Sequence, residues 1–399
     1  MASKNKLFII VSGNRYPEGD AGAVRTHAFA KIFSSLGFRV LVIGMGETTN
    51  FKIKNYDEID YCSLRYNRSD IFFRAYGRLS FCRHCKSVLK EQKISDIAGI
   101  MYVSGGSKIL TSIKRMSSKY GVPLYFDSVE WYSPCEYKAG VMNLEYMRND
   151  RLNRKDIDKR FHVFAISRYM ENYFKSKTIP AVRIPVIMDV AKMSVRSKSC
   201  GFDTNKINII YAGSPGRKDH LQELIDAIGL LDNSEKDRVC FRIVGMSKEQ
   251  YEKMYGCVPE SVCGRTVIFE GRKSRNETLQ QLRNSDFSFL LRPSDERYTK
   301  AGFPTKAVES LASGVPLLCN YSSDLDLYLK DGENSIIVEN CTTEACLNAL
   351  RHVIAVSHDE LATMKINARK TAEDNFDWRL YEPSVCNFIK ASEKNVECG

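Results

Sequence analysis

A glycine-rich turn in the second half of the chain has the residue types that bind an anion. Residues 209–218 read Ile-Ile-Tyr-Ala-Gly-Ser-Pro-Gly-Arg-Lys, so an apolar run opens into a turn that contains Gly213 and Ser214. Glycines let a backbone approach an anion closely, and the free N–H groups of a following helix favour negative charge. Arg217 and Lys218 would neutralise a diphosphate there. A plain strand-to-helix turn with solvated basic residues explains the same segment, and this alternative stays open.

A second group of polar residues follows another apolar run, between positions 292 and 309. Arg292 ends the run, and a polar loop leads to Pro304. Proline suits the first turn of a helix, because its missing N–H needs no partner there. The backbone amides that open this helix would then face an anion. The residues of this group that could contact such a ligand are Gly302, Phe303, Thr305, Lys306 and Glu309.

Glu309 is the carboxylate of this group. A carboxylate accepts hydrogen bonds from both hydroxyls of a ribose diol. A lone glutamate in a helix is usually solvent-facing, but Glu309 lies between Val308 and Leu311, in a helix that ends in Gly-Val-Pro. This context favours a binding role, so the pattern predicts a site for a nucleotide that carries a diphosphate.

These residues need a framework that brings the ends of separate strands together. The chain has 399 residues, which suits two α/β domains of similar size. Short apolar runs alternate with amphipathic segments such as 23–36 and 108–120, a rhythm that predicts parallel sheets covered by helices on both faces. The predicted strands are 6–12, 39–44, 98–103, 124–128, 163–167, 207–212, 239–244, 266–270, 287–291, 316–319 and 336–338.

The alternation pauses at about residues 191–205, where Lys, Ser, Arg, Asp and Gly replace apolar residues. Such a stretch is typical of a linker. We therefore expect one domain over residues 1–192 and a second over residues 193–375. Two doubly wound domains in succession leave a cleft between the carboxyl ends of their strands, and ligands bind at such places.

Six motifs follow one another along the chain in a characteristic order. They are Glu-Gly-Asp-Ala-Gly-Ala-Val-Arg at 18–25, Tyr-Ala-Gly at 211–213, Phe-Arg-Ile-Val-Gly at 241–245, Val-Ile-Phe-Glu-Gly at 267–271, the segment 278–284 and the segment 302–316. The series resembles the retaining family-4 glycosyltransferases over nearly the whole chain. The resemblance implies the GT-B fold, in which two Rossmann-like doubly wound parallel-sheet domains face a central cleft.

Further segments resemble a bacterial subgroup of this family that builds capsule, exopolysaccharide or O-antigen chains. They are Val-Glu-Trp-Tyr-Ser-Pro at 129–134, Ala-Ile-Ser-Arg-Tyr at 165–169, Arg-Ile-Pro-Val-Ile-Met-Asp at 183–189 and Ala-Gly-Phe-Pro-Thr-Lys at 301–306. The tail Asn-Phe-Asp-Trp-Arg at 375–379 resembles the start of the family's final helix. Residues 376–399 are therefore expected to return to the first domain.

The resemblance implies roles for both polar groups. The expected reaction moves a hexosyl unit, with retention, from a nucleotide-diphosphate sugar to a glycan or lipid-linked acceptor. No metal or other cofactor is expected, because the protein stabilises the departing diphosphate. The residues expected to supply that charge are Arg217, Lys218 and Arg292. The expected donor contacts come from Gly213, Ser214, Gly302, Phe303, Thr305, Lys306 and Glu309.

The chain departs from the family's signature of two glutamates separated by seven residues. Glu309 matches the second, but Ala301 occupies the first position, which contacts the donor sugar in relatives. Backbone amides around Gly302, or Glu296 from the preceding loop, could replace that contact. Ser214 stands where the family usually has an arginine, so diphosphate binding falls to the three cations named above.

The first domain is expected to hold the acceptor. The candidate residues near the first loop and after a strand are Gly22, Arg25, His27, Glu130 and Trp131. Glu130 and Trp131 are favoured, because residues that line a cleft come from the carboxyl ends of strands. For His27, a place on the helix surface is the favoured alternative.

The net charge of +11 suggests an anionic partner. Two basic stretches, 65–90 with interleaved aromatics and 148–160, could lie on an anionic membrane surface; solvated helices are the equal alternative. Nucleic acid is not an expected partner, since the sequence has no recognition motif. The chain has no export signal and no apolar run of about 20 residues. The expected location is the cytoplasm, with peripheral binding to the inner face of the cell membrane if the first alternative holds.

The sequence has three other interpretations. Cys82 and Cys85 form a CxxC, but no second ligand pair lies at finger-like spacing, which favours a structural role. A nicotinamide dehydrogenase is disfavoured, because the first strand leads to Gly-Asn-Arg-Tyr-Pro-Glu-Gly and not to G-x-G-x-x-G. A non-catalytic partner subunit of the same fold, which binds nucleotide or glycan, is the alternative that stays open.

Overall fold

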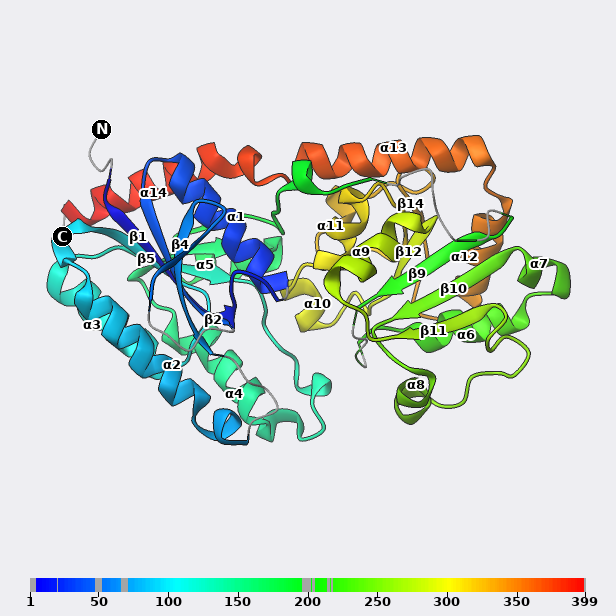
Figure 1. The fold of residues 1–399 in the computed structure, drawn as a ribbon, viewed down its shortest axis with the longest axis horizontal. Coiled ribbons are helices and arrows are strands. Elements are labelled where there is room, and N and C mark those ends of the chain that lie inside the picture. Colours follow the sequence, from blue (N-terminus) through cyan, green and yellow to red (C-terminus); the bar gives the residue numbers. More distant parts are fainter. Residues whose placement is uncertain are drawn as a thin grey trace. The chain divides into compact units, whose positions relative to one another are not determined.

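The structure is a computed structural model that describes residues 5–19, 21–46, 52–65, 71–195, 202, 205–213, 216 and 218–397 (Figure 1). The chain divides into two compact units. The first contains Met1–Tyr132, Val141–Asp189 and Asp377–Gly399, and the second contains Ser133–Gly140 and Val190–Phe376. The C-terminal segment therefore belongs to the first unit, and a short segment from the first half of the chain belongs to the second.

An eight-stranded sheet with strand order β3-β4-β2-β1-β5-β6-β7-β8 forms the centre of the first unit. Its neighbouring strands are parallel, apart from the antiparallel pair of β3 and β4 at one edge. The strands are β1 (Leu7–Arg15), β2 (Arg39–Gly46), β3 (Lys54–Tyr56), β4 (Ile59–Arg65), β5 (Ile97–Tyr102), β6 (Leu124–Ser128), β7 (Phe161–Ala165) and β8 (Ala181–Arg183).

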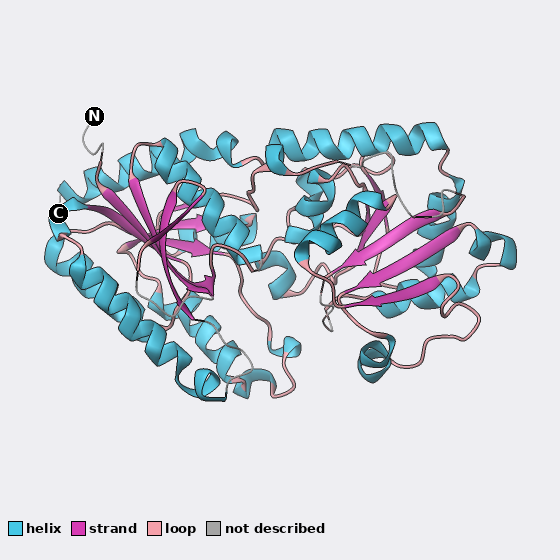
Figure 2. Ribbon diagram, viewed as in Figure 1, coloured by secondary structure: helices cyan, strands magenta, loops and turns pink. Residues whose placement is uncertain are grey.

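Helices cover both faces of this sheet (Figure 2). On one face, Phe33 and Val385 join Phe8 in a single buried cluster. Successive side chains of a strand point to opposite faces of the sheet. Tyr125 therefore contacts Ser392 on this face, while Phe126 contacts Phe174 on the other. The first face is covered by α1 (Ala21–Ser35) and α14 (Glu382–Glu397), and the other by α2 (Ile71–Glu91), α3 (Ser107–Tyr120) and α5 (Arg168–Ser176).

The second unit has a six-stranded sheet in which every neighbouring pair is parallel, with strand order β11-β10-β9-β12-β13-β14. Its strands are β9 (Ile207–Ala212), β10 (Val239–Val244), β11 (Val267–Gly271), β12 (Phe287–Leu290), β13 (Leu317–Cys319) and β14 (Ser335–Ile337). The fully buried Ile209 and Phe241 pack with one helical layer, while Ile210 packs with Leu282 on the opposite face.

The helical layers of the second unit follow this alternation. The first layer contains α6 (Leu221–Leu230), α8 (Lys248–Tyr255) and α12 (Thr343–Ala355). The opposite layer contains α9 (Arg275–Asn284), α11 (Thr305–Ala312) and α13 (His358–Asn375). Two short helices, α7 (Asn233–Asp237) and α10 (Arg297–Ala301), lie in connections between strands and longer helices.

Each sheet has one place where the strand order reverses. In the second unit the chain winds outward from β9 through β10 to β11 and then returns to β12 on the other side of β9. In the first unit the reversal lies between β1 and β5. Doubly wound sheets bind ligands outside the carboxyl ends of the strands at such a switch point. The turns after β9 and β12 are therefore the places to examine in the second unit.

Both units have the predicted α/β architecture, and β9 and β10 have the predicted bounds. Three strands were not predicted. The hairpin strand β3 is exposed along its length, so it carries no apolar signal, and β4 and β8 are sheet strands near or at the edges. β1 also continues to Arg15, beyond the predicted turn at Gly13, because Arg15 pairs with Met45 after a shift in register.

Candidate functional site

The turn after β9 is built so that its backbone lies close to another side chain. Gly213 has a φ of 129°, a value that favours glycine. A Cβ atom at this position would lie 2.7 Å from Cε of Lys306. Its N–H donates to the carbonyl of Val244 at 2.9 Å. Two predicted site residues of the turn, Ser214 and Arg217, lie outside the described residues.

Asp219 holds the arginine that follows β12. Its Oδ1 accepts hydrogen bonds from Nε and Nη2 of Arg292, each at 3.1 Å, and its Oδ2 accepts from the N–H of Gly216 at 3.0 Å. Burial alone would raise the pKa of Asp219, but Lys306, Arg292 and these donors outweigh burial and lower it. The aspartate is thus a buried anion that fixes a predicted catalytic cation at the switch point.

Lys306 extends from the first turn of α11 to the same place. Its ammonium group lies 3.9 Å from the centre of the Tyr211 ring and donates to the Tyr211 hydroxyl. The residue as a whole is partly exposed, and its charged end lies over the Tyr211 ring. Burial lowers the pKa of Lys306 to about 8, although the Asp219 charge opposes this shift. The prediction used the backbone amide of Lys306; the structure also brings its side chain to the turn.

Glu309 lies on α11 one turn after Thr305, and its carboxylate is half of an ion pair. Its Oε1 accepts from Nη2 of Arg275 at 2.6 Å. Arg275 is the first residue of α9, whose N-cap Ser274 forms a capping box with Glu277. Sequence reasoning did not identify Arg275. The capping box could have predicted that Arg275 begins a helix, but it could not have predicted the contact with Glu309, 34 positions away.

The residues before α11 present their backbone rather than their side chains. Phe303 is buried, with its ring 5.8 Å from those of Tyr328 and Phe376. The carbonyl of Gly302 accepts a hydrogen bond from the Ser323 hydroxyl. Ala301 is fully buried, so the position where relatives carry the first glutamate lies in the core.

The segment Ser133–Gly140 adds a carboxylate that sequence reasoning missed. Oε1 of Glu136 lies 3.5 Å from Nζ of Lys218, and Oε2 accepts from the N–H of Ser133 at 2.9 Å. The Ser133 hydroxyl in turn accepts from the N–H of Tyr298 at 3.2 Å. Lys218, a predicted diphosphate-binding cation, is therefore already neighboured by an anion.

In the first unit, α1 carries three of the predicted acceptor-side residues. Gly22 is partly exposed near the start of the helix. Arg25 is buried and pairs with Asp127 of β6 at 2.8 Å, and its guanidinium also donates to the carbonyls of Ile184 and Pro185. These contacts hold α1 on the sheet.

His27 lies further along α1 and is partly exposed. Its Nδ1 is 2.9 Å from the hydroxyl of Tyr16, and its Nε2 is 3.0 Å from Oδ2 of Asp57. The imidazole thus connects the helix with the end of β1 and with the β3–β4 hairpin.

The two residues after β6 differ in exposure. The side chain of Glu130 is exposed, while its carbonyl accepts from Asn149 and Asn153. Trp131 is buried, and its indole N–H donates to Asp150 at 2.9 Å. Glu130 can reach a ligand, and Trp131 supports it from within the unit.

The carboxyl ends of β1 and β5 meet at the switch point of the first unit. The N–H of Gly13 donates to the carbonyl and to the hydroxyl of Ser104, at 3.1 and 2.9 Å. A Cβ at Gly13 would lie 3.2 Å from the backbone of Gly105. Sequence reasoning did not select this close approach, although Ser-Gly-Gly-Ser after a predicted strand is a turn signal.

Comparison with protein families gives a match within the second unit. Residues 195–371 match the family model described as glycosyl transferases group 1. A search of curated protein sequences gives no match.

Solved structures with the same fold span nearly the whole chain. Sucrose-phosphate synthase from Thermosynechococcus elongatus is 13% identical with a TM-score of 0.73, over 97% of this chain and 99% of that one. HepE of Anabaena, in complex with UDP and glucose, is 15% identical with a TM-score of 0.65, over 97% and 100%. WaaG, a glycosyltransferase involved in lipopolysaccharide biosynthesis, is 13% identical with a TM-score of 0.65, over 96% and 99%. The predicted GT-B fold is confirmed.

Other features of the structure bear on the remaining expectations. Among the described residues, no group of three or more His, Cys, Asp or Glu side chains could hold a metal ion. Cys82 and Cys85 are buried on α2, and burial raises the pKa of Cys85. Within the same residues, no helix is long and apolar enough to span a membrane.

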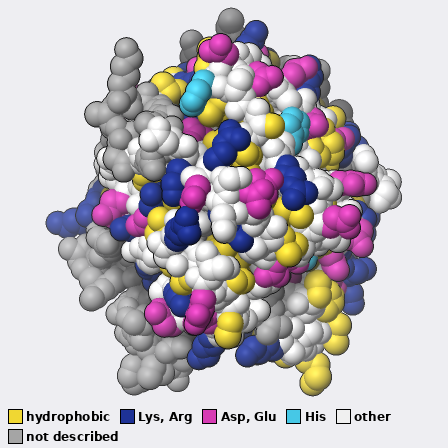
Figure 3. All heavy atoms as spheres, turned by 90° about the vertical axis from the view of Figure 1, so that its right-hand side faces the viewer, with side chains coloured by type: hydrophobic (Ala, Val, Ile, Leu, Met, Phe, Trp, Pro, Cys, Tyr) yellow, Lys and Arg dark blue, Asp and Glu magenta, His cyan; other side chains and the backbone are white. Residues whose placement is uncertain are grey.

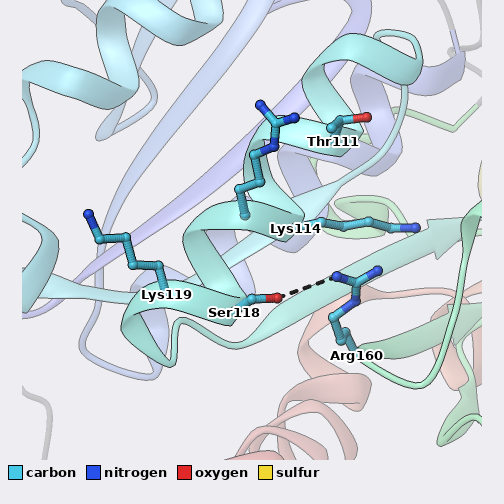
Figure 4. Close-up of a pocket in the computed structure, with 6 residues that line it drawn as sticks. Thr111, Lys114, Ser118, Lys119 and Arg160 are labelled. Atoms are coloured by element: carbon cyan, nitrogen blue, oxygen red, sulfur yellow. Dashed lines mark hydrogen bonds between the residues drawn. The ribbon is translucent and has the colours of Figure 1, made fainter.

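The surface carries charges of both signs. On the face drawn in Figure 3, basic and acidic side chains are interspersed. A hollow on the first unit is more basic (Figure 4), but it lies where α3 ends and β7 begins, at the opposite edge of the sheet from the carboxyl ends of the strands. Its lining residues are Thr111, Lys114, Arg115, Ser118, Lys119 and Arg160.

Proposed function

We propose that the second unit binds a nucleoside diphosphate sugar and that the enzyme transfers the sugar, with retention, to a glycan or lipid-linked acceptor in cell-surface polysaccharide synthesis. One observation carries this proposal: the Gly213 turn, Arg292 and Lys306 meet at the switch point, and Glu309 lies on the same helix as Lys306. The complex of HepE with UDP and the role of WaaG in lipopolysaccharide biosynthesis support the donor and the pathway.

In the retaining mechanism that the resemblance implies, the acceptor oxygen bonds to the anomeric carbon as the bond from that carbon to the diphosphate breaks. The acceptor proton passes to a phosphate oxygen of the donor. Arg217, Lys218, Arg292 and the amides that open α11 stabilise the departing charge. Glu309 holds the ribose hydroxyls. Protein cations thus do the work that a metal ion does in other transferases.

The donor sugar needs a contact to replace the missing first glutamate. The backbone at Gly302 and the carboxylates of Glu296 and Glu136 are the groups that the second unit offers near this position. Glu296 accepts from the Cys135 thiol at 3.5 Å, and Glu136 lies beside Lys218. The acceptor binds to the first unit, where Gly22, His27 and Glu130 are accessible and Arg25 and Trp131 hold them in place.

A screen of nucleotide-sugars by thermal unfolding tests the proposal. A ligand that binds the native state raises the melting temperature, and we expect a rise with at least one uridine, guanosine or adenosine diphospho-sugar. The variant Glu309→Ala should weaken that nucleotide by roughly tenfold, the cost of about 1.4 kcal/mol of charge-assisted hydrogen bonding. Glu333→Ala, an exposed glutamate in the same unit, is the control. No response to any donor would favour the non-catalytic alternative.

A membrane surface is the proposed location of a lipid-linked acceptor, and α4 (Leu144–Arg151) of the first unit is the contact. Met142 and Leu144 are 80% and 65% exposed, beside exposed Arg148 and Arg151. Apolar side chains next to cations suit the boundary of an anionic bilayer. The exposed apolar side chains carry the membrane proposal, because the charges of α4 itself, Glu145, Arg148, Asp150 and Arg151, cancel.

Liposome co-sedimentation tests this contact. We expect binding to vesicles that contain phosphatidylglycerol at low salt, weaker binding at high salt, and loss of binding in the double variant Met142→Ser/Leu144→Ser. Leu230→Ser removes an equally exposed apolar side chain from the second unit and should leave binding unchanged. Equal binding to neutral and anionic vesicles would overturn the contact.

A further inference from the structure

The ammonium group of Lys306 lies against Gly213, the residue that follows β9, and over the ring of Tyr211. Its Cε would lie 2.7 Å and its Nζ 3.1 Å from a Cβ placed on Gly213. The backbone of the turn therefore rests on the end of this side chain. An anion bound at Gly213 would therefore lie close to this ammonium group.

A chain of hydrogen bonds leads from Lys306 to a buried carboxylate. Lys306 donates to the hydroxyl of Tyr211, a residue with no exposed surface, and that hydroxyl bonds to Asp219. Asp219 also accepts from Arg292 and Gly216. The lysine thus reaches the carboxylate only through a phenol, while an arginine contacts the carboxylate directly.

The carboxylates near Lys306 do not neutralise its positive charge, because each is paired with an arginine. Asp219 is engaged by Arg292, and Glu309 is engaged by Arg275. Lys306 itself has no ion pair in the described part of the chain, and its first polar neighbour is neutral. The groups that face this network are Tyr211 on β9, Lys218, Asp219 and His220 in the following turn, Tyr255 on α8, Arg292 after β12, and Glu309 on α11.

We propose that Lys306 takes up a proton when the diphosphate of the donor binds above Gly213, so that donor affinity depends on the charge of this side chain. The inference rests on the proposed function, because the diphosphate is its ligand. The phosphate oxygens give Lys306 the anionic partner that it lacks in the free protein. A nearby negative charge favours the protonated form of a lysine. When a protein takes up a proton on binding a ligand, its affinity for that ligand falls as the pH rises, because the proton concentration falls.

The direction of the pH dependence follows from the pKa of Lys306. In the free protein that pKa is about 8, and the bound diphosphate raises it. Below pH 7 the lysine is already charged, so its own contribution to affinity no longer changes with pH. Between pH 7 and pH 9 we expect affinity to fall by about tenfold, because binding must then supply the proton.

Isothermal titration calorimetry in two buffers of different ionisation enthalpy measures the proton directly. The probe is whichever of UDP, GDP or ADP raises the melting temperature most. At pH 8.5 we expect uptake of about half to one proton per nucleotide. Lys306→Arg, which stays charged at this pH, should bind with no uptake and with constant affinity from pH 7 to pH 9.

Two further variants separate Lys306 from its surroundings. Lys370→Arg, on the exposed side of α13, should take up the proton as the wild type does. Tyr211→Phe removes only the phenol hydroxyl and should retain the uptake. Uptake that persists in Lys306→Arg would assign the proton to another group, such as His220, and overturn the inference. If no nucleoside diphosphate binds at any pH, the proposed function fails; if one binds without uptake, only this inference fails.

Discussion

Glu309 and Arg275 show how a binding carboxylate is prepared at the scale of single residues. The carboxylate has one oxygen engaged by the guanidinium at 2.6 Å; the side chain of Glu309 is 16% exposed and that of Arg275 is 44% exposed. An ion pair of this kind fixes a rotamer and leaves the second oxygen for a ligand. Arg275 is therefore a positioning residue for the proposed ribose contact.

Replacing Arg275 tests that role. Arg275→Ala should weaken nucleotide binding by about three- to tenfold, since Glu309 loses one charge-assisted hydrogen bond of about 1 kcal/mol. Arg275→Lys restores a charge without the planar fork and should recover only part of the affinity. Titration of the best nucleoside diphosphate by calorimetry measures both. Tighter binding in the alanine variant would show that the arginine competes with the ribose.

The sequence identifies the residues of this site that are neighbours along the chain, but not those that packing brings to it. Gly213, Lys218 and Glu309 follow recognisable turn and helix signals. Arg275 and Glu136 have no such signal, because they come from elements whose approach depends on the fold. Side-chain direction is equally hidden, as in Lys306, whose length lets its ammonium reach β9.

At the scale of elements, one buried ion pair attaches α1 to the first sheet. Arg25 contacts Asp127 on β6 and the two carbonyls that follow β8. Burial raises the pKa of Asp127, although the arginine opposes this shift. Removing one partner of such a pair leaves an uncompensated charge in the core.

Asp127→Leu should therefore destabilise the protein by about 3–5 kcal/mol, while the double variant Arg25→Met/Asp127→Leu should lose clearly less. Urea unfolding followed by circular dichroism measures both losses. Asp60→Leu, which replaces an exposed aspartate on β4, is the control and should cost under about 0.5 kcal/mol. Additive losses in the double variant would show that the two side chains do not act as a pair.

Elements are predictable where burial on both faces produces an apolar run. β9 and β10 are such strands, each flanked on both sides in the sheet. β3 has no buried residue and forms because β4 offers it hydrogen bonds, a partner that is absent from any local window of sequence. β8 is three residues long and lies at the opposite edge of the sheet. It was not predicted because its partner strand, β7, is distant in sequence.

At the scale of the whole molecule, the last helix completes the first unit. Val385 is fully buried against the first sheet, the Phe388 ring lies 5.4 Å from that of Phe164, and Ser392 bonds to the hydroxyl of Tyr125. A chain that stops after Phe376 would expose this apolar face. The stability of the two units should therefore respond differently to truncation.

We expect the truncated chain to lose the folded first unit and to keep the second. Differential scanning calorimetry should show one remaining transition, and the nucleoside diphosphate that binds the intact enzyme should raise its temperature. The intact chain with Lys390→Ala, an exposed residue of the same helix, should melt like the wild type. A remaining transition that no longer responds to nucleotide would mean that the second unit depends on the first.

The path of the chain through the two units has a mechanical consequence. Asn5 and Glu397, the described ends of the chain, both belong to the first unit, and the second is inserted between its parts. A force applied to these two ends is therefore carried by the first unit alone until that unit opens. Held by its ends in an optical trap, the protein should yield first where the acceptor is proposed to bind, and the nucleotide should leave this first rupture force unchanged.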